Sequence, residues 1–149
     1  MRTGLQMCVL FIILAAASAT QAAPIVPTGV GPGESYHLAF ITRDLVPISS
    51  SDIDYYNEFV TEQAALNPSV TGTMGSPGQY RGISWFAIAS TGDGTHARDN
   101  ALVQAPVYLF DSSKVADGFD DMWDASIDHA LNVDQFLSTS VHDFVATGS

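Results

Sequence analysis

The segment 83–127 most constrains the fold, because it places an apolar strand, a polar loop, a second apolar strand and a short aromatic helix in direct succession. Residues 84–90 (SWFAIAS) carry apolar side chains at alternating and intervening positions, which predicts a strand buried on both faces. Residues 107–110 (VYLF) follow Pro106 and predict another strand, with a turn and a hairpin return over 111–116. This segment is therefore interpreted first as scaffold.

An aromatic helix is predicted directly after the hairpin. Residues 117–127 (DGFDDMWDASI) begin with Asp117 as a plausible N-cap and have Asp120 three positions later. At helical spacing the outer face is acidic and the inner face is apolar. The residues expected to face inward are Phe119, Met122, Trp123 and Ile127.

The preceding chain predicts one strand and one longer helix. Residues 36–42 (YHLAFIT) alternate with apolar side chains on both faces, as in a paired strand. The helix is expected from Ser50 or Ser51 as N-cap to a stop at Pro68, with acidic residues in its first turn. Its inward stripe comprises Ile53, Tyr56, Phe59, Val60, Gln63 and Ala64. Core packing explains these aromatic residues better than a ligand shelf does.

Two further segments have weaker patterns. Residues 68–82 are rich in Gly and Pro without a period and predict a loop. The pattern weakens after Asp128, and a strand is expected to begin near Val141, shortly before the chain stops at Ser149.

The first 22 residues have the layout of a secretory signal peptide. A basic residue, Arg2, precedes the apolar run 5–17, and small residues follow it. Cleavage is expected after Ala22 or Ala19. A membrane anchor is the alternative, but the run is shorter than the roughly 20 residues that span a bilayer. Residues 23–35 predict a Pro/Gly-rich linker, and 36–149 a single domain.

Export would remove Cys8, which is the single cysteine, and Arg2. The exported chain would then have no disulfide or thiol nucleophile, so its apolar core must stabilise it. This favours a bacterial exported protein over a disulfide-rich animal module. Four basic residues remain against sixteen acidic ones, a formal net charge of −12. Nucleic acid and anionic membranes are therefore disfavoured as partners, whereas cations are compatible.

A set of short motifs in residues 36–149 resembles a group of exported bacterial proteins, many of which carry PEP-CTERM sorting tails. The motifs are WFAIAST at 85–91, ARDN at 97–100, PVY at 106–108, VAD at 115–117 and MWD at 122–124. The same order of elements resembles the endostatin branch of the C-type-lectin-like fold, in which a Trp-containing helix follows a Pro-introduced strand. The resemblance implies an α+β domain with a mixed sheet and two helices.

The chain departs from that resemblance at its end. Residues 145–149 would occupy the position of a Trp-x-Gly-type strand but lack the tryptophan, and the closing strand is absent. This predicts a domain truncated at its C-terminus. No apolar C-terminal helix followed by basic residues is present, so a sorting tail is not carried over. Endostatin's zinc and heparin residues have no counterparts either.

One polar loop gathers candidate ligand-binding residues within eight positions. Several carboxylates and carbonyls in one loop can bind calcium, although the spacing is not that of an EF-hand. The structural alternative is that Arg98 pairs with Asp99 or another acid while Asn100 caps a turn. The candidates are Asp93, His96, Arg98, Asp99 and Asn100.

The aromatic helix carries a second acidic cluster. If the helix persists, Asp117, Asp121, Asp124 and Asp128 approach one another, and a bound cation would relieve their repulsion. The calcium candidates are Asp117, Asp121 and Asp124; a solvated acidic face is the alternative. Carboxylates could also act as an acid/base pair in glycoside hydrolysis, which requires a defined separation in a cleft. The histidines lack zinc-site spacing, and no GxSxG motif is present.

Together these features predict a secreted or surface-associated, non-catalytic binding module. Glycan or matrix polymer is the expected ligand class, by fold analogy. One alternative is a secreted hydrolase that uses the aspartates of the 93–99 loop and the 117–128 helix. Another is a structural component of an extracellular matrix.

Overall fold

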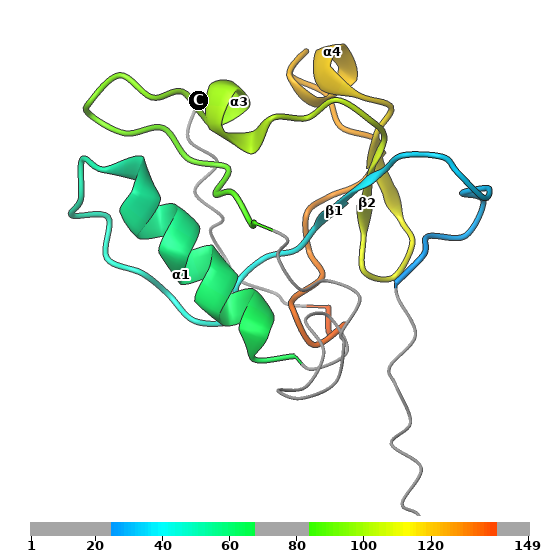
Figure 1. Cartoon of the computed structure of the whole chain (residues 1–149), viewed down its shortest axis with the longest axis horizontal. Helices are drawn as coiled ribbons and strands as arrows, with labels where there is room; N and C mark the ends of the chain where they lie inside the picture. The colour runs from blue at the N-terminus through cyan, green and yellow to red at the C-terminus, as the bar shows by residue number, and fades with distance from the viewer. Residues whose placement is uncertain (1–24, 68–83, 140–149) are drawn as a thin grey trace, which may run out of the picture.

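The computed structural model of the protein describes residues 25–67 and 84–139, which form a small α+β fold (Figure 1). The signal segment, the loop 68–82 and the strand expected near Val141 lie outside these residues. The described elements are β1 (His37–Ala39), α1 (Ile53–Ala65), α3 (Ala97–Ala101), β2 (Val107–Leu109), β3 (Lys114–Ala116) and α4 (Phe119–Met122). The α+β class and the mixed sheet are confirmed. The expectation of two helices is wrong for the described part of the chain, since α3 was not predicted.

The sheet has β2 at its centre. β2 pairs in parallel with β1, with His37 opposite Val107, and antiparallel with β3. Parallel neighbours need a long crossover, and α1 lies in that connection. The β2–β3 hairpin turns where predicted: Asp111 accepts a hydrogen bond from the Ser113 backbone N–H at 2.9 Å, and Ser112 adopts a φ of 74°.

The core lies against this sheet. Leu109, Val115 and Ala116 are fully buried within it. An aromatic group packs beside them, with ring centroids of Phe40 and Trp85 5.1 Å apart and those of Phe40 and Phe110 5.3 Å apart. Since the chain has a single cysteine, it forms no internal disulfide, and this packing provides its main stabilisation.

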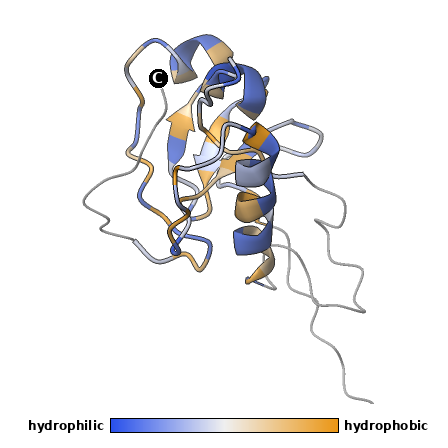
Figure 2. Ribbon diagram, turned by 90° about the vertical axis from the view of Figure 1, so that its left-hand side faces the viewer, coloured by the Kyte–Doolittle hydropathy of each residue, from blue (hydrophilic) through white to orange (hydrophobic). Residues whose placement is uncertain are grey.

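Helix α1 packs one stripe against the interior, as Figure 2 indicates by the alternation of apolar and polar residues along it. Tyr56, Gln63 and Ala64 of the predicted stripe are buried. The predicted N-cap is wrong: Asp52 caps the helix by accepting from the Asp54 N–H at 3.0 Å. The Ser50 hydroxyl instead accepts from the Asp52 N–H and closes the turn that precedes the helix.

Residues 84–90 are not the predicted strand. They run as an irregular segment between α1 and the sheet (Figure 1). Polar side chains, rather than a neighbouring strand, bind the backbone of Ala87. Its N–H donates to Asn57 Oδ1 at 2.8 Å, and its carbonyl accepts from Asn100 Nδ2 at 2.8 Å. Because those backbone groups are already paired, this part of the segment does not need a sheet ladder.

Helix α4 is shorter than predicted. Gly118, not Asp117, is its N-cap, and the helix ends at Met122. The Asp124 carboxylate accepts from the Ser126 N–H at 2.9 Å, and Ala125 adopts a φ of 74°, so a local turn replaces the next helical turn. As a result, Met122 is buried as predicted, but Phe119 and Ile127 are exposed rather than inward.

The segment 133–139 attaches to the region after β1. Val133 accepts from the Ile41 N–H at 2.9 Å, and Ile41 forms an isolated parallel bridge with Asp134. Asp134 and Gln135 are buried at 1% and 0% exposure. Within the described residues, no helix has the length and apolar character required to cross a membrane.

The Pro/Gly-rich residues 25–35 form two consecutive turns. The first is closed by the Val30 N–H donating to Pro27 O at 3.2 Å, and Pro27 is buried. Tyr36 holds the start of this segment by donating its hydroxyl to Ile25 O at 3.0 Å. The described part of the expected linker therefore packs on the domain.

Candidate functional site

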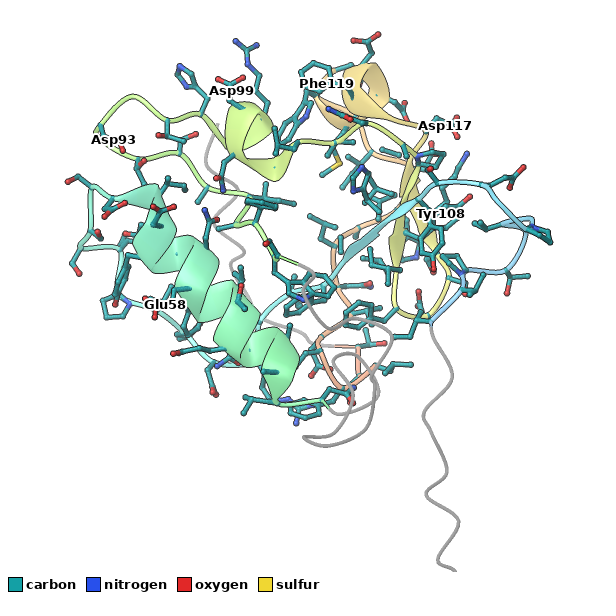
Figure 3. All side chains as sticks on the ribbon, viewed as in Figure 1. Glu58, Asp93, Asp99, Tyr108, Asp117 and Phe119 are labelled. Atoms are coloured by element: carbon teal, nitrogen blue, oxygen red, sulfur yellow. The ribbon has the colours of Figure 1, made fainter. Side chains whose placement is uncertain are left out.

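An open hollow lies between α3 and α4, with a volume of about 510 Å³. Figure 3 places Asp99 and Phe119 on these two facing helices. The hollow is lined by Arg98, Asp99, Leu102, Val103, Gln104 and Phe119. Ligand sites commonly have volumes of roughly 300–1,000 Å³ and combine apolar walls with a few polar groups.

Helix α3 is held in place by a reciprocal amide pair. Asn57 Nδ2 donates to Asn100 Oδ1 at 3.1 Å, and Asn100 Nδ2 donates to Asn57 Oδ1 at 2.9 Å. At the start of α3, the Ala97 N–H donates to the Ser90 hydroxyl at 3.1 Å. These bonds connect α3 to α1 and to residues 84–90, which fixes one wall of the hollow. Asn100, predicted as a ligand-binding or turn-capping residue, therefore takes part in this internal network.

Arg98 and Asp99 contribute the charges of the hollow. The Arg98 Nε and Asp99 Oδ1 lie 3.8 Å apart, so the expected pairing of Arg98 with Asp99 is present. Both side chains are about 60% exposed, and the pair is correspondingly weak. Solvent-exposed hydrogen-bonding groups of both signs are thus available on this wall.

The apolar surface of the hollow was not found from the sequence. Phe119 is 45% exposed and Leu102 is 52% exposed. Leu102 was not singled out, and Phe119 was assigned to the core because its position fitted a longer helix. A local signal that could have indicated this surface is Leu102, an apolar residue three positions after Asp99.

Asp93 and His96 do not line the hollow. Asp93 lies on the loop that precedes α3 (Figure 3). Its carboxylate accepts from the Thr91 hydroxyl at 2.7 Å and from the Thr95 N–H at 2.9 Å, and these bonds lower the pKa of Asp93. His96 is the exposed N-cap of α3 and makes no capping bond with its side chain. The structure therefore brings Arg98 and Asp99 together in the hollow, apart from the other predicted ligand residues.

The acidic cluster forms on the other side of α4 and includes two of its three calcium candidates. Oxygens of Asp117, Asp121 and Asp128 lie within 4.8 Å of one another, whereas Asp124 is not part of this group. Lys114 Nζ is 2.6 Å from Asp117 and 3.5 Å from Asp128. The hydrogen bond to Asp117 raises the pKa of Lys114, so the lysine supplies a positive charge to this group.

We predict that about 1 mM calcium leaves the Tm of the protein unchanged, because the Lys114 ammonium already occupies the space beside the carboxylates. Replacing the lysine, in Lys114→Met, should produce a calcium-dependent rise in Tm. The second change Asp121→Asn should abolish that rise. Differential scanning fluorimetry measures all three proteins. A calcium-dependent rise in the unmodified protein that Asp121→Asn removes would contradict this prediction.

No protein-family model, curated protein or solved structure matches this chain.

Proposed function

We propose that the protein is an exported, non-catalytic binding module of the extracellular space or cell surface, and that the hollow between α3 and α4 binds a neutral glycan. The observation that carries this proposal is the combination of Phe119 and Leu102 with Arg98, Asp99 and Gln104 around one open depression. The export part is based on the signal-like residues 1–22.

The chemistry of a sugar ring fits these walls. Its C–H faces pack on apolar and aromatic surface, and its hydroxyls both donate and accept hydrogen bonds. Arg98 donates, Asp99 accepts, and the Gln104 side-chain amide does both. The chain is strongly acidic, so a neutral polymer fits better than a polyanion. The shallow, open shape suits a segment of a long chain rather than an enclosed small molecule.

The carboxyl groups around the hollow support binding rather than glycoside hydrolysis. That reaction uses two carboxyl groups that flank the scissile bond. Among the described residues that line the hollow, Asp99 is the one carboxylate.

The order of elements supports a C-type-lectin-like architecture. Pro106 introduces β2, the β2–β3 hairpin follows, and α4 with Trp123 comes next. This is the succession expected from the resemblance to the endostatin branch. An experimental structure of the whole exported chain tests this assignment by the number and pairing of its strands.

The glycan proposal is tested by isothermal titration calorimetry against neutral hexasaccharides of glucose, xylose and N-acetylglucosamine. At least one should bind, and Phe119→Ala should weaken that binding about tenfold, equal to about 1.4 kcal/mol. The matched control is Phe86→Ala, because Phe86 is 43% exposed and does not line the hollow. Equal loss in both variants, or no binding to any of the probes, would refute the proposal.

A further inference from the structure

The wall of the hollow is attached to the sheet through one histidine. The backbone N–H of Gln104 donates to His37 Nε2 at 3.1 Å, and the backbone N–H of His37 donates to Pro106 O at 2.8 Å. Gln104 lines the hollow, whereas His37 belongs to β1. Both ends of the short stretch 104–106 are thus bound to one residue of the sheet.

The bond to Gln104 requires one protonation state of His37. A ring nitrogen accepts a hydrogen bond only when it carries no proton, so Nε2 must be bare and the proton of the neutral ring must be on Nδ1. Burial lowers the pKa of His37, which favours this neutral form. An imidazolium would point an N–H at the Gln104 N–H, and the bond would be lost.

The backbone beside Gln104 depends on such support. Leu102, two residues earlier, ends α3 in the left-handed region at φ 48° and ψ 42°. A leucine pays a steric cost in this conformation and keeps it only where its surroundings enforce it. Leu102 is also a lining residue, so the loss of the Gln104 bond would affect the apolar part of the hollow directly.

Charged groups do not explain the state of His37. Burial is the cause of its lowered pKa, without a contribution from a charge among the described residues. The stretch 102–106 holds no charged residue, and Tyr108, the titratable residue of β2, lies opposite Leu38 rather than opposite His37. On α3, the charged Arg98 and Asp99 are exposed. The protonation of His37 itself is therefore the event to which the wall responds.

We propose that His37 is a positioning residue for the hollow: its neutral ring holds Gln104 and the adjoining Leu102 in place, and its protonation releases them. This regulation rests on the proposed glycan function, but the state of the wall is measured without any glycan. The binding surface is therefore formed at pH values above the midpoint of the His37 titration and loosened at pH values below it.

The test is an NMR pH titration of the uniformly ¹⁵N-labelled protein. The His37 ring should show the Nδ1–H tautomer at neutral pH. The amide proton of Gln104 should shift upfield with the same midpoint as the His37 ring. The Nε2–H tautomer, or a Gln104 amide that does not change while His37 titrates, would overturn the proposal.

Two variants separate this role from a general effect of pH. His37→Gln should abolish the step in the Gln104 amide, because the side chain no longer titrates. His129→Gln should leave the step unchanged, since the His129 Nδ1 contacts Ala130 O at 2.9 Å on another part of the surface. A step that persists in His37→Gln would contradict the proposal. If this variant does not fold, the titration of the unmodified protein decides alone.

The consequence for binding is measured with the best hexasaccharide of the calorimetric series. Loss of one hydrogen bond from the wall should raise its Kd about fivefold between the neutral and protonated forms of His37. A Kd that is constant through the titration would refute the regulatory role. Absence of glycan binding at every pH would refute the proposed function, while the coupling between His37 and Gln104 is judged by the NMR titration.

Discussion

Replacing Asp134 with asparagine is expected to lower the free energy of unfolding by about 2 kcal/mol, and replacing it with alanine by about 3 kcal/mol. Asp134 is 1% exposed, and its carboxylate takes part in both an ion pair and a backbone turn. One carboxylate oxygen accepts from Arg43 Nε at 2.9 Å and Nη2 at 2.6 Å. The other accepts from the backbone N–H groups of Phe136 at 2.8 Å and Ser138 at 2.9 Å.

The two substitutions separate these roles. Asparagine retains one oxygen for the turn but faces the guanidinium with an NH₂ group, so the ion pair is lost. Alanine removes both. The cost of the ion pair itself is limited because the Arg43 side chain is 48% exposed. Arg43 also lies over the Phe136 ring, with its Cζ 4.4 Å from the ring centroid. The loss of Asp134 should therefore also weaken this cation–π contact.

The Asp134→Asn effect should depend on pH in a defined direction. Burial of Asp134 opposes ionisation, but the hydrogen bonds from Ser138, Arg43 and Phe136 outweigh it and lower the pKa of Asp134. The folded state thus favours the carboxylate. Its stabilising effect is complete above the unfolded pKa of about 3.9 and is lost as the pH falls through the lower, folded value. The difference between the two proteins should therefore be full at neutral pH and narrow in acid.

Urea denaturation at several pH values measures these differences. Asp124→Asn is the matched control, because exposed Asp124 also accepts a backbone N–H two residues later but forms no ion pair among the described residues. It should change stability by less than about 0.5 kcal/mol. Equal effects at both positions would show that the ion pair between Arg43 and Asp134 contributes nothing to stability.

The segment around Asp134 illustrates why part of the fold was not predicted. Local patterns identified α1 and the β2–β3 hairpin, because helical spacing and turn residues act between near neighbours. The attachment of Asp134 to Arg43 spans 91 positions, and Gln63 reaches Gln135 across 72. Buried polar residues of this kind resemble surface residues in a sequence, so residues after 128 were interpreted as a weakening pattern.

The candidate site was predicted in part for the same reason. The pairing of Arg98 with Asp99 follows from adjacency and was expected. The apolar half of the hollow depends on which side of α4 meets the core. Met122 is buried, whereas Phe119, the first residue of the same helix, is 45% exposed. The exposure of Phe119 is therefore set by tertiary packing and cannot be predicted from helical spacing.

Asn100→Asp is expected to destabilise the fold by about 3 kcal/mol, whereas Asn57→Asp should cost only about 1 kcal/mol. The orientation of both amides is fixed by the backbone of Ala87: its N–H must donate to an oxygen of Asn57, and its carbonyl must accept from the nitrogen of Asn100. Asn100 Nδ2 thus donates to both Ala87 O and Asn57 Oδ1. An aspartate there would present oxygen to two oxygens.

Asn57 has the opposite arrangement, which makes its variant the matched control for Asn100→Asp. Its Oδ1 accepts from Ala87 and Asn100, and an aspartate retains both bonds while losing one donor. Both variants change the net charge equally, so the difference in their urea-denaturation free energies reports the direction of the hydrogen bonds. The cost of Asn100→Asp should also shrink as the pH falls toward about 4, because a protonated carboxyl regains a donor. Since Asn100 holds α3, and α3 carries Arg98 and Asp99, equal destabilisation by the two variants would remove the physical basis for the position of this wall of the hollow.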